Sequence, residues 1–238
     1  MNKKIILGML ALILAFGMMV AGCGGDGGTI RFDPIDASSV PSFTGTPVTS
    51  EKEAEELADE ALAVIDMILE EAGVMPGLFS ASRNGIPSPD LNTTSVNITL
   101  NHNGITGYYK ADATYNDSGS SVNFSINTDI LVRVDGTYTY AGTTYRIQGL
   151  AEETKANLNG SVTQNSFSMR GFFSSRSGFS VTRLSDGVGM KFVSTANLTL
   201  NVSNNSDSIR GMASIKVFDN SNNVIFSYEQ TVDDIYGY

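Results

Sequence analysis

Several residue types that often carry chemistry are scarce in this 238-residue chain. It contains no tryptophan, one histidine (His102) and one cysteine (Cys23). A single cysteine excludes disulfide bonds within the chain, and one histidine with one cysteine cannot supply the ligands of a zinc site. Basic residues are outnumbered, since there are 15 lysines and arginines but 25 acids. Sequence-independent binding of nucleic acid needs a positive surface, so nucleic acid is not an expected partner.

Long apolar runs are absent after residue 22, and the run before it has the layout of a secretory signal. Lys3 and Lys4 precede an apolar stretch over residues 5–20, and small residues close it. Residues 1–22 are therefore predicted to be a cleaved signal peptide. Cleavage removes both lysines, which changes the formal charge from −10 to −12. The alternative is a transmembrane helix, because residues 5–22 are long enough for a membrane span, which needs about 17–25 residues. A transmembrane helix does not explain why the segment ends in Ala-Gly-Cys.

The motif Val20-Ala21-Gly22-Cys23 resembles the lipobox of bacterial lipoproteins. The resemblance implies that Cys23 becomes the acylated first residue of the mature chain and attaches it to a membrane. At least two acyl chains give stable attachment, because each buried CH₂ contributes about 0.8 kcal/mol. Inner-membrane retention in Gram-negative lipoproteins typically goes with Cys-Asp, so Gly24 favours the outer membrane in such a cell. The chain is thus expected to be a lipid-anchored protein of the cell envelope.

Composition divides the rest of the chain into a tether and one domain. Residues 23–49 hold a Gly-Gly-Asp-Gly-Gly run and three prolines without a sustained helical or strand period. They are predicted to form a lipid-anchored flexible tether, with one short strand near residues 30–35 as the alternative. Residues 50–238 are predicted to form a single domain of a helix followed by a β-meander.

Residues 51–72 are expected to form an amphipathic helix. Ser50 and Glu53 have capping-box spacing, and Gly73 supplies a C-terminal stop. The apolar residues recur every three or four positions on one stripe: Ala54, Leu57, Ala58, Ala61, Leu62, Ile65, Ile68 and Leu69. Nine acids between residues 51 and 71 make the other face a solvated acidic surface.

From Thr94 onward the apolar period is two, which predicts strands with one apolar face and one face rich in Ser, Thr and Asn. Turn residues, among them Asp135-Gly136, Asn159-Gly160 and residues 175–178, divide this region into strands. About ten strands result, near 94–102, 105–115, 121–134, 137–148, 151–158, 161–173, 179–185, 188–203, 208–218 and 224–232. Ala141-Gly142 is interpreted as a bulge. The predicted fold is mainly β with one N-terminal helix, an antiparallel meander curled into a half-barrel or incomplete barrel around that helix. This outline resembles lipid-carrier lipoproteins of the periplasm and of mycobacterial envelopes, without a shared motif.

Two features of the sequence contain residue types that can act as catalytic groups. His102 lies beside the Asn103-Gly104 turn, and no nucleophile or carboxylate is positioned for it by the pattern. The acid pairs Glu152-Glu153 and Asp233-Asp234 do not suit a glycosidase, since adjacent strand residues point to opposite faces and cannot span a cleft. No catalytic residue is assigned, and the chain is not expected to be an enzyme.

Residues 219–223 resemble a calcium loop in part, because Asp219, Ser221 and Asn223 alternate like the start of an EF-hand. Val224 occupies the position where an EF-hand loop requires glycine, and Gln230 occupies the position of the bidentate glutamate. The loop is therefore interpreted as a polar hairpin. No metal or other cofactor is assigned, and Cys23 is the one site residue, for lipid attachment.

Three functions stay open from the sequence. The first is a non-catalytic binding or scaffolding role at the membrane. The second is a carrier of lipids or other amphiphiles, in which the half-barrel holds a hydrophobic ligand. The third is a lipid-embedded small β-barrel, suggested by the aromatic end Ile235-Tyr236-Gly237-Tyr238. The sequence assigns no oligomeric state.

Overall fold

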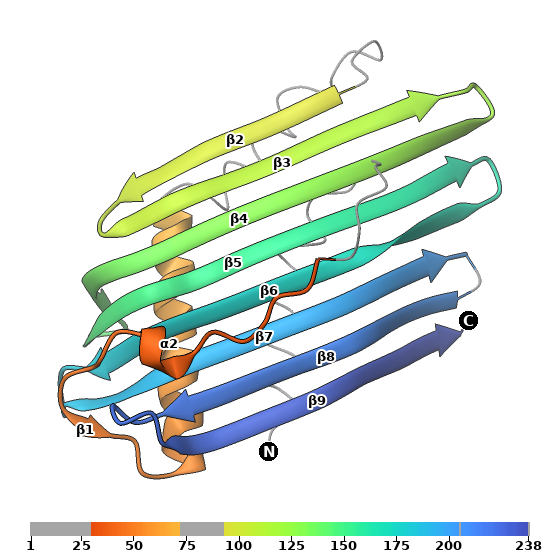
Figure 1. Cartoon of the computed structure of the whole chain (residues 1–238). Helices are drawn as coiled ribbons and strands as arrows, with labels where there is room; N and C mark the ends of the chain where they lie inside the picture. The colour runs from red at the N-terminus through yellow and green to blue at the C-terminus, as the bar shows by residue number, and fades with distance from the viewer. Residues whose placement is uncertain (1–29, 72–92, 205, 238) are drawn as a thin grey trace.

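The computed structural model describes residues 30–71, 93–204 and 206–237. The predicted signal peptide, Cys23, the helix stop at Gly73 and Tyr238 lie outside the described residues. Within these ranges the chain forms one α-helix, one 3-10 turn and one β-sheet (Figure 1). The elements are η1 (Ala37–Ser39), β1 (Thr46–Pro47), α2 (Glu51–Glu71), β2 (Thr93–His102), β3 (Ile105–Asp117), β4 (Ser121–Tyr140), β5 (Thr143–Thr163), β6 (Phe167–Arg183), β7 (Val188–Ser203), β8 (Ser206–Phe218) and β9 (Val224–Gly237).

The sheet is an antiparallel meander, as the alternating sequence predicts. Strands β2 to β9 pair in chain order, and the short β1 adds to β7 in parallel. Strands β2 and β9 form the two edges, and among the described residues neither pairs with a further strand. The sheet is therefore open, in keeping with a half-barrel, and has nine strands rather than about ten. In the part of the chain that the structure describes, no helix is both long and apolar enough to cross a membrane.

The strands are longer and fewer than the turn residues predict. Asp135-Gly136, Asn159-Gly160 and residues 175–178 were expected to be turns, yet they lie inside β4, β5 and β6. The Tyr138 side chain of the same strand packs over Gly136, since a Cβ there would lie 2.2 Å from the Tyr138 hydroxyl. These three turn predictions are wrong because a glycine in a strand also marks a close approach by another group.

The interpretation of Ala141-Gly142 as a bulge is also wrong. These two residues are the turn between β4 and β5, with φ angles of 47° and 83°. Two positive φ values are the geometry of a tight hairpin turn, which alanine seldom adopts. The bulge in β5 lies instead between Leu150 and Glu153, where the register with β6 shifts.

Helix α2 crosses the strands on one face of the sheet, here called the helix face (Figure 1). Leu57, Ala61 and Val64 are fully buried there, and Ile68 is 1% exposed. Apolar residues from the sheet complete this core, among them Ile105, Ile130, Phe179, Phe192 and Val217. The predicted stripe is confirmed except at Leu62, which is only partly buried, while Val64 occupies a core position.

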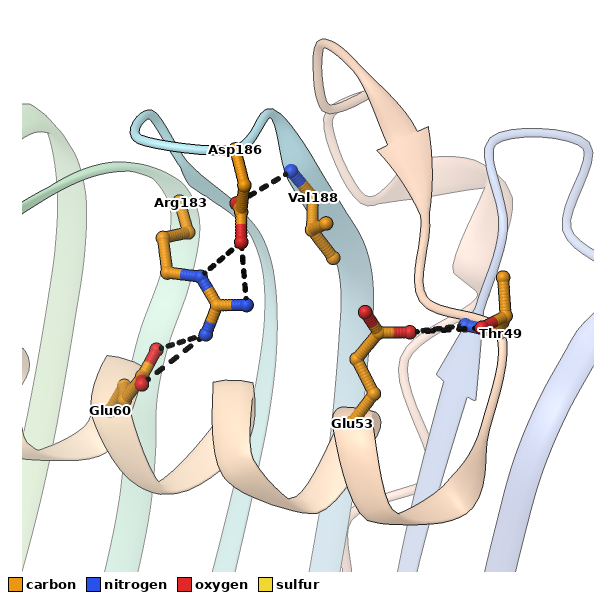
Figure 2. Close-up of polar contacts among 6 residues, drawn as sticks. All are labelled: Thr49, Glu53, Glu60, Arg183, Asp186 and Val188. Carbon is orange, nitrogen blue, oxygen red and sulfur yellow. Dashed lines mark hydrogen bonds and ion pairs between the residues drawn. The ribbon is translucent and has the colours of Figure 1, made fainter.

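Polar contacts fix both the start and the middle of α2 (Figure 2). The Glu53 carboxylate accepts a hydrogen bond from the Thr49 amide at 2.7 Å, which satisfies a backbone donor in front of the helix. Farther along, Arg183 of β6 donates to Glu60 at 3.1 Å and to Asp186 at 2.8 Å. Hydrogen bonding to Arg183 lowers the pKa of Asp186. Arg183 thus fastens the helix to the turn between β6 and β7.

Candidate functional site

Residues 30–49, here called the strap, start on the other face of the sheet, the outer face (Figure 1). The strap then joins the sheet through β1 beside β7, and Val48 packs in the core on the helix face. The prediction of a flexible tether is wrong for this part of residues 23–49. The Phe32 amide donates to Asn197 Oδ1 at 2.9 Å, and Asn197 Nδ2 donates back to the Phe32 carbonyl at 3.0 Å. Asn220 holds Phe43 in the same two-bond manner, at 3.0 and 2.8 Å. The partners are side-chain amides far away in the chain, so no local pattern reveals them.

Further contacts hold the strap between these two asparagines. Lys191, which is 3% exposed, donates from Nζ to the Ala37 carbonyl at 3.2 Å and to Asn222 Oδ1 at 2.8 Å. A Cβ at Gly178 would lie 2.9 Å from Ile35, so glycine allows the strap to approach β6 closely. The alternative of a short strand near residues 30–35 is also wrong, since the pairing segment of the strap is β1.

A groove of about 460 Å³ opens on the outer face where the strap begins. Register places the side chains of Thr199, Arg210 and Asp233 side by side on the outer face, because Thr199 lies opposite Arg210 and Arg210 lies opposite Asp233. The lining comes from the strap and from β6 to β9: Arg31, Ser174, Asn197, Leu198, Thr199, Arg210, Gly211, Thr231, Val232 and Asp233. The groove therefore joins the chain nearest the predicted anchor to four strands of the sheet.

The groove offers hydrogen bonds and positive charge. Two guanidinium groups, three hydroxyls and the Asn197 amide line it. Arg210 pairs with Asp233 at 2.8 Å, but their side chains are 61% and 63% exposed, so this pair contributes little and leaves the guanidinium accessible. Arg31 is exposed as well. Guanidinium groups bind carboxylates and phosphates through two parallel hydrogen bonds, so the lining suits a polar ligand with an anionic group.

The structure separates His102, Glu152 and Glu153, the candidate catalytic residues of the sequence. His102 is exposed at the turn between β2 and β3. Glu153 pairs with Arg176 at 2.7 Å on the outer face, whereas Glu152 on the helix face accepts a hydrogen bond from Thr154 at 2.7 Å. The two glutamates thus point to opposite faces, as alternation predicts.

The acids weighed at the C-terminal end also lie apart. Asp233 lines the groove, while the side chain of Asp234 lies outside the described residues. Asp219 accepts hydrogen bonds within its own turn, from the Asn223 amide and side chain, both at 2.8 Å. No group of three or more potential metal ligands occurs among the residues that the structure describes.

The groove itself was missed by sequence reasoning. Arg31, Asn197 and Arg210 are far apart in the chain, and only the pairing of β7 with β8 and the path of the strap bring them together. The alternation of polar and apolar residues placed Arg210 on a polar face, which was the available signal.

The chain matches no protein-family model, no curated protein and no solved structure.

The strap should loosen when Asn197 is replaced by alanine. The substitution removes both hydrogen bonds to Phe32, each worth about 0.5–1.5 kcal/mol. We expect roughly ten-fold faster amide hydrogen exchange at residues 31–36, with exchange in α2 unchanged. Asn201→Ala, an exposed asparagine farther along the same strand, is the control. Equal protection of the strap in both variants would show that Asn197 does not hold it.

Proposed function

We propose that this chain is a lipid-anchored protein of the cell envelope that acts by binding, and that the groove beside the strap is its binding site. The observation that carries the proposal is the position of the strap. Ile30 contacts Ser174 in the groove lining through a 2.5 Å hydrogen bond, and it follows Cys23 by seven residues. Seven residues span at most roughly 25 Å, so an anchored Cys23 keeps the groove near the membrane surface.

The groove supports binding rather than catalysis. Its volume falls within the range of sites that bind small molecules, about 300–1,000 Å³. Its lining holds no histidine or cysteine, and its one carboxylate, Asp233, is exposed and paired with Arg210. A general base must lie within hydrogen-bond reach of the proton that it takes, whereas the Asp233 carboxylate is engaged by Arg210. Recognition of a polar, negatively charged ligand is the chemistry that remains.

The packing of α2 favours this proposal over a carrier of amphiphiles. A carrier needs a sizeable apolar cavity. The described apolar residues of α2 that face the sheet are 0–6% exposed, because side chains from both elements fill the space between them. The groove lies on the opposite face and is polar.

Anchoring is tested with full-length chains produced in a Gram-negative host. We expect the wild-type protein in the membrane fraction, cleaved before Cys23 and heavier by the mass of its acyl chains. Cys23→Ser should lose both the cleavage and the acyl mass, whereas Gly24→Ala should keep them. A wild-type chain without acyl mass would overturn the anchor. Turnover of glycan, ester or peptide substrates that disappears in Asp233→Asn would overturn the binding role.

A further inference from the structure

The two faces of the domain differ in charge. Between residues 51 and 69, α2 carries seven acids and one lysine, and all of the acids except Asp66, whose Oδ1 is buried, form an acidic surface on the helix face. The outer face carries charges of both signs around the groove. Arg31 and Arg210 line the groove, and the exposed Arg170 lies two strands away from Arg210. The acids nearby are Asp233 in the lining and the exposed Asp33 and Glu229 beside it. An anionic surface would therefore repel the helix face much more strongly than this part of the outer face, where accessible guanidinium groups can meet it.

Two exposed apolar side chains flank the same groove. Ile30 is 42% exposed at the start of the strap, and Met212 is 50% exposed on β8. Met212 lies opposite Asn197 and Thr231, both of which line the groove. Apolar side chains next to arginines are typical of surfaces that rest on a bilayer, where the apolar groups enter the headgroup boundary and the cations meet anionic headgroups.

We propose that the outer face around the groove docks on the membrane surface and that Arg31 and Arg210 bind the phosphate of an anionic lipid headgroup. This inference rests on the proposed function in that an anchored Cys23 brings the outer face, which bears the strap, to the bilayer. The acidic helix then faces away from the membrane. Arginine suits this ligand because its planar group makes two parallel hydrogen bonds with phosphate oxygens.

The absence of tryptophan allows a direct test. The mature chain carrying Met212→Trp has a single tryptophan on the docking surface. It is reconstituted into phosphatidylcholine vesicles with or without phosphatidylglycerol, both containing brominated phosphatidylcholine as quencher. We expect quenching and a blue-shifted emission in the anionic vesicles, and less of both without phosphatidylglycerol. Asp59→Trp, on the exposed side of α2, should stay unquenched in both.

The arginines are then removed in the Met212→Trp background. Each basic residue near an anionic surface contributes about 1 kcal/mol, or roughly five-fold. Arg31→Gln with Arg210→Gln should thus lower the ratio of docked to undocked chains about 25-fold. The control pair, Lys110→Gln with Arg133→Gln, removes two exposed charges from β3 and β4 and should have little effect.

The outcomes separate this inference from the anchor. Equal loss of quenching in both double variants would overturn the assignment of phosphate binding to the groove. Quenching at Asp59→Trp instead of Met212→Trp would overturn the orientation. The intact mass of the reconstituted protein reports acylation independently, and an unacylated chain that still sediments with anionic vesicles would support docking while contradicting the anchor. Circular dichroism checks that every variant is folded.

Discussion

Replacing Leu57 with alanine is expected to lower the free energy of unfolding by about 2–5 kcal/mol. Leu57 is fully buried between α2 and the sheet, so the shorter side chain loses apolar burial and leaves a cavity. A typical domain is stable by only about 5–15 kcal/mol, so this single change removes a large share. Urea denaturation followed by circular dichroism measures the difference.

The matched control for Leu57 is Leu62→Ala on the same helix. Leu62 is partly buried, so the same substitution should cost clearly less. The helix propensities of the two variants are equal, because both replace leucine by alanine. Equal losses at the two positions would contradict the arrangement in which one side of α2 forms the core of the domain.

The second large effect is a fall in stability as pH rises, caused by two acids near the interface of α2 with the sheet. Burial raises the pKa of Asp66 on α2 to about 6. Burial, together with the nearby Asp66 carboxylate, raises the pKa of Glu152 on β5 to about 7. Asp66 Oδ1 is buried and accepts no hydrogen bond. Both groups are therefore more easily protonated in the folded chain than in the unfolded chain.

The sign of the effect follows from proton counting. Between about pH 4 and 7 the unfolded chain has lost protons that the folded chain keeps, so the slope of unfolding free energy against pH is negative. The contribution of these acids to stability is complete below pH 4 and is lost as pH rises through about 7. Urea midpoints measured at intervals from pH 4 to 8 should show this fall.

Glu152→Gln isolates the contribution of one acid. Glutamine still accepts the hydrogen bond from Thr154 but has no charge to bury. We expect the variant to be more stable than the wild type at pH 8 by about 1–3 kcal/mol, with a flatter pH profile. Glu153→Gln is the control, because it removes a charge paired with Arg176 on the opposite face and should not stabilise the domain. A wild-type pH slope in Glu152→Gln would contradict the assignment.

Local patterns predicted the elements of the fold better than their boundaries. The step of three or four residues located α2, and the step of two located the sheet, because these periods follow directly from helix and strand geometry. The turns were less well predicted. Gly136 and Gly160 lie within strands, where a Cβ would clash with Tyr138 and Phe124, and the hairpin at Ala141 uses a residue that rarely adopts positive φ.

The candidate site was the least predictable part of the molecule. Asn197 and Asn220 have the composition of ordinary solvated strand and turn residues, yet each holds the backbone of a residue more than 160 positions earlier. A lysine such as Lys191 is ordinarily expected at the surface, but its side chain is nearly buried beneath η1. Such contacts depend on the path of the strap. The glycine and proline content of this segment predicted a flexible tether instead.

The sequence by itself determined the type of each large element and which side chains of α2 and the strands face the core, because apolar burial acts through the local periods of helix and strand. It also supplied the lipobox motif on which the predicted anchor rests. Tertiary structure alone decided that the strap crosses the outer face, that α2 covers the other, and that Arg31 meets Arg210 in one groove. These outcomes depend on hydrogen bonds and close approaches between residues far apart in the chain, which no local period encodes.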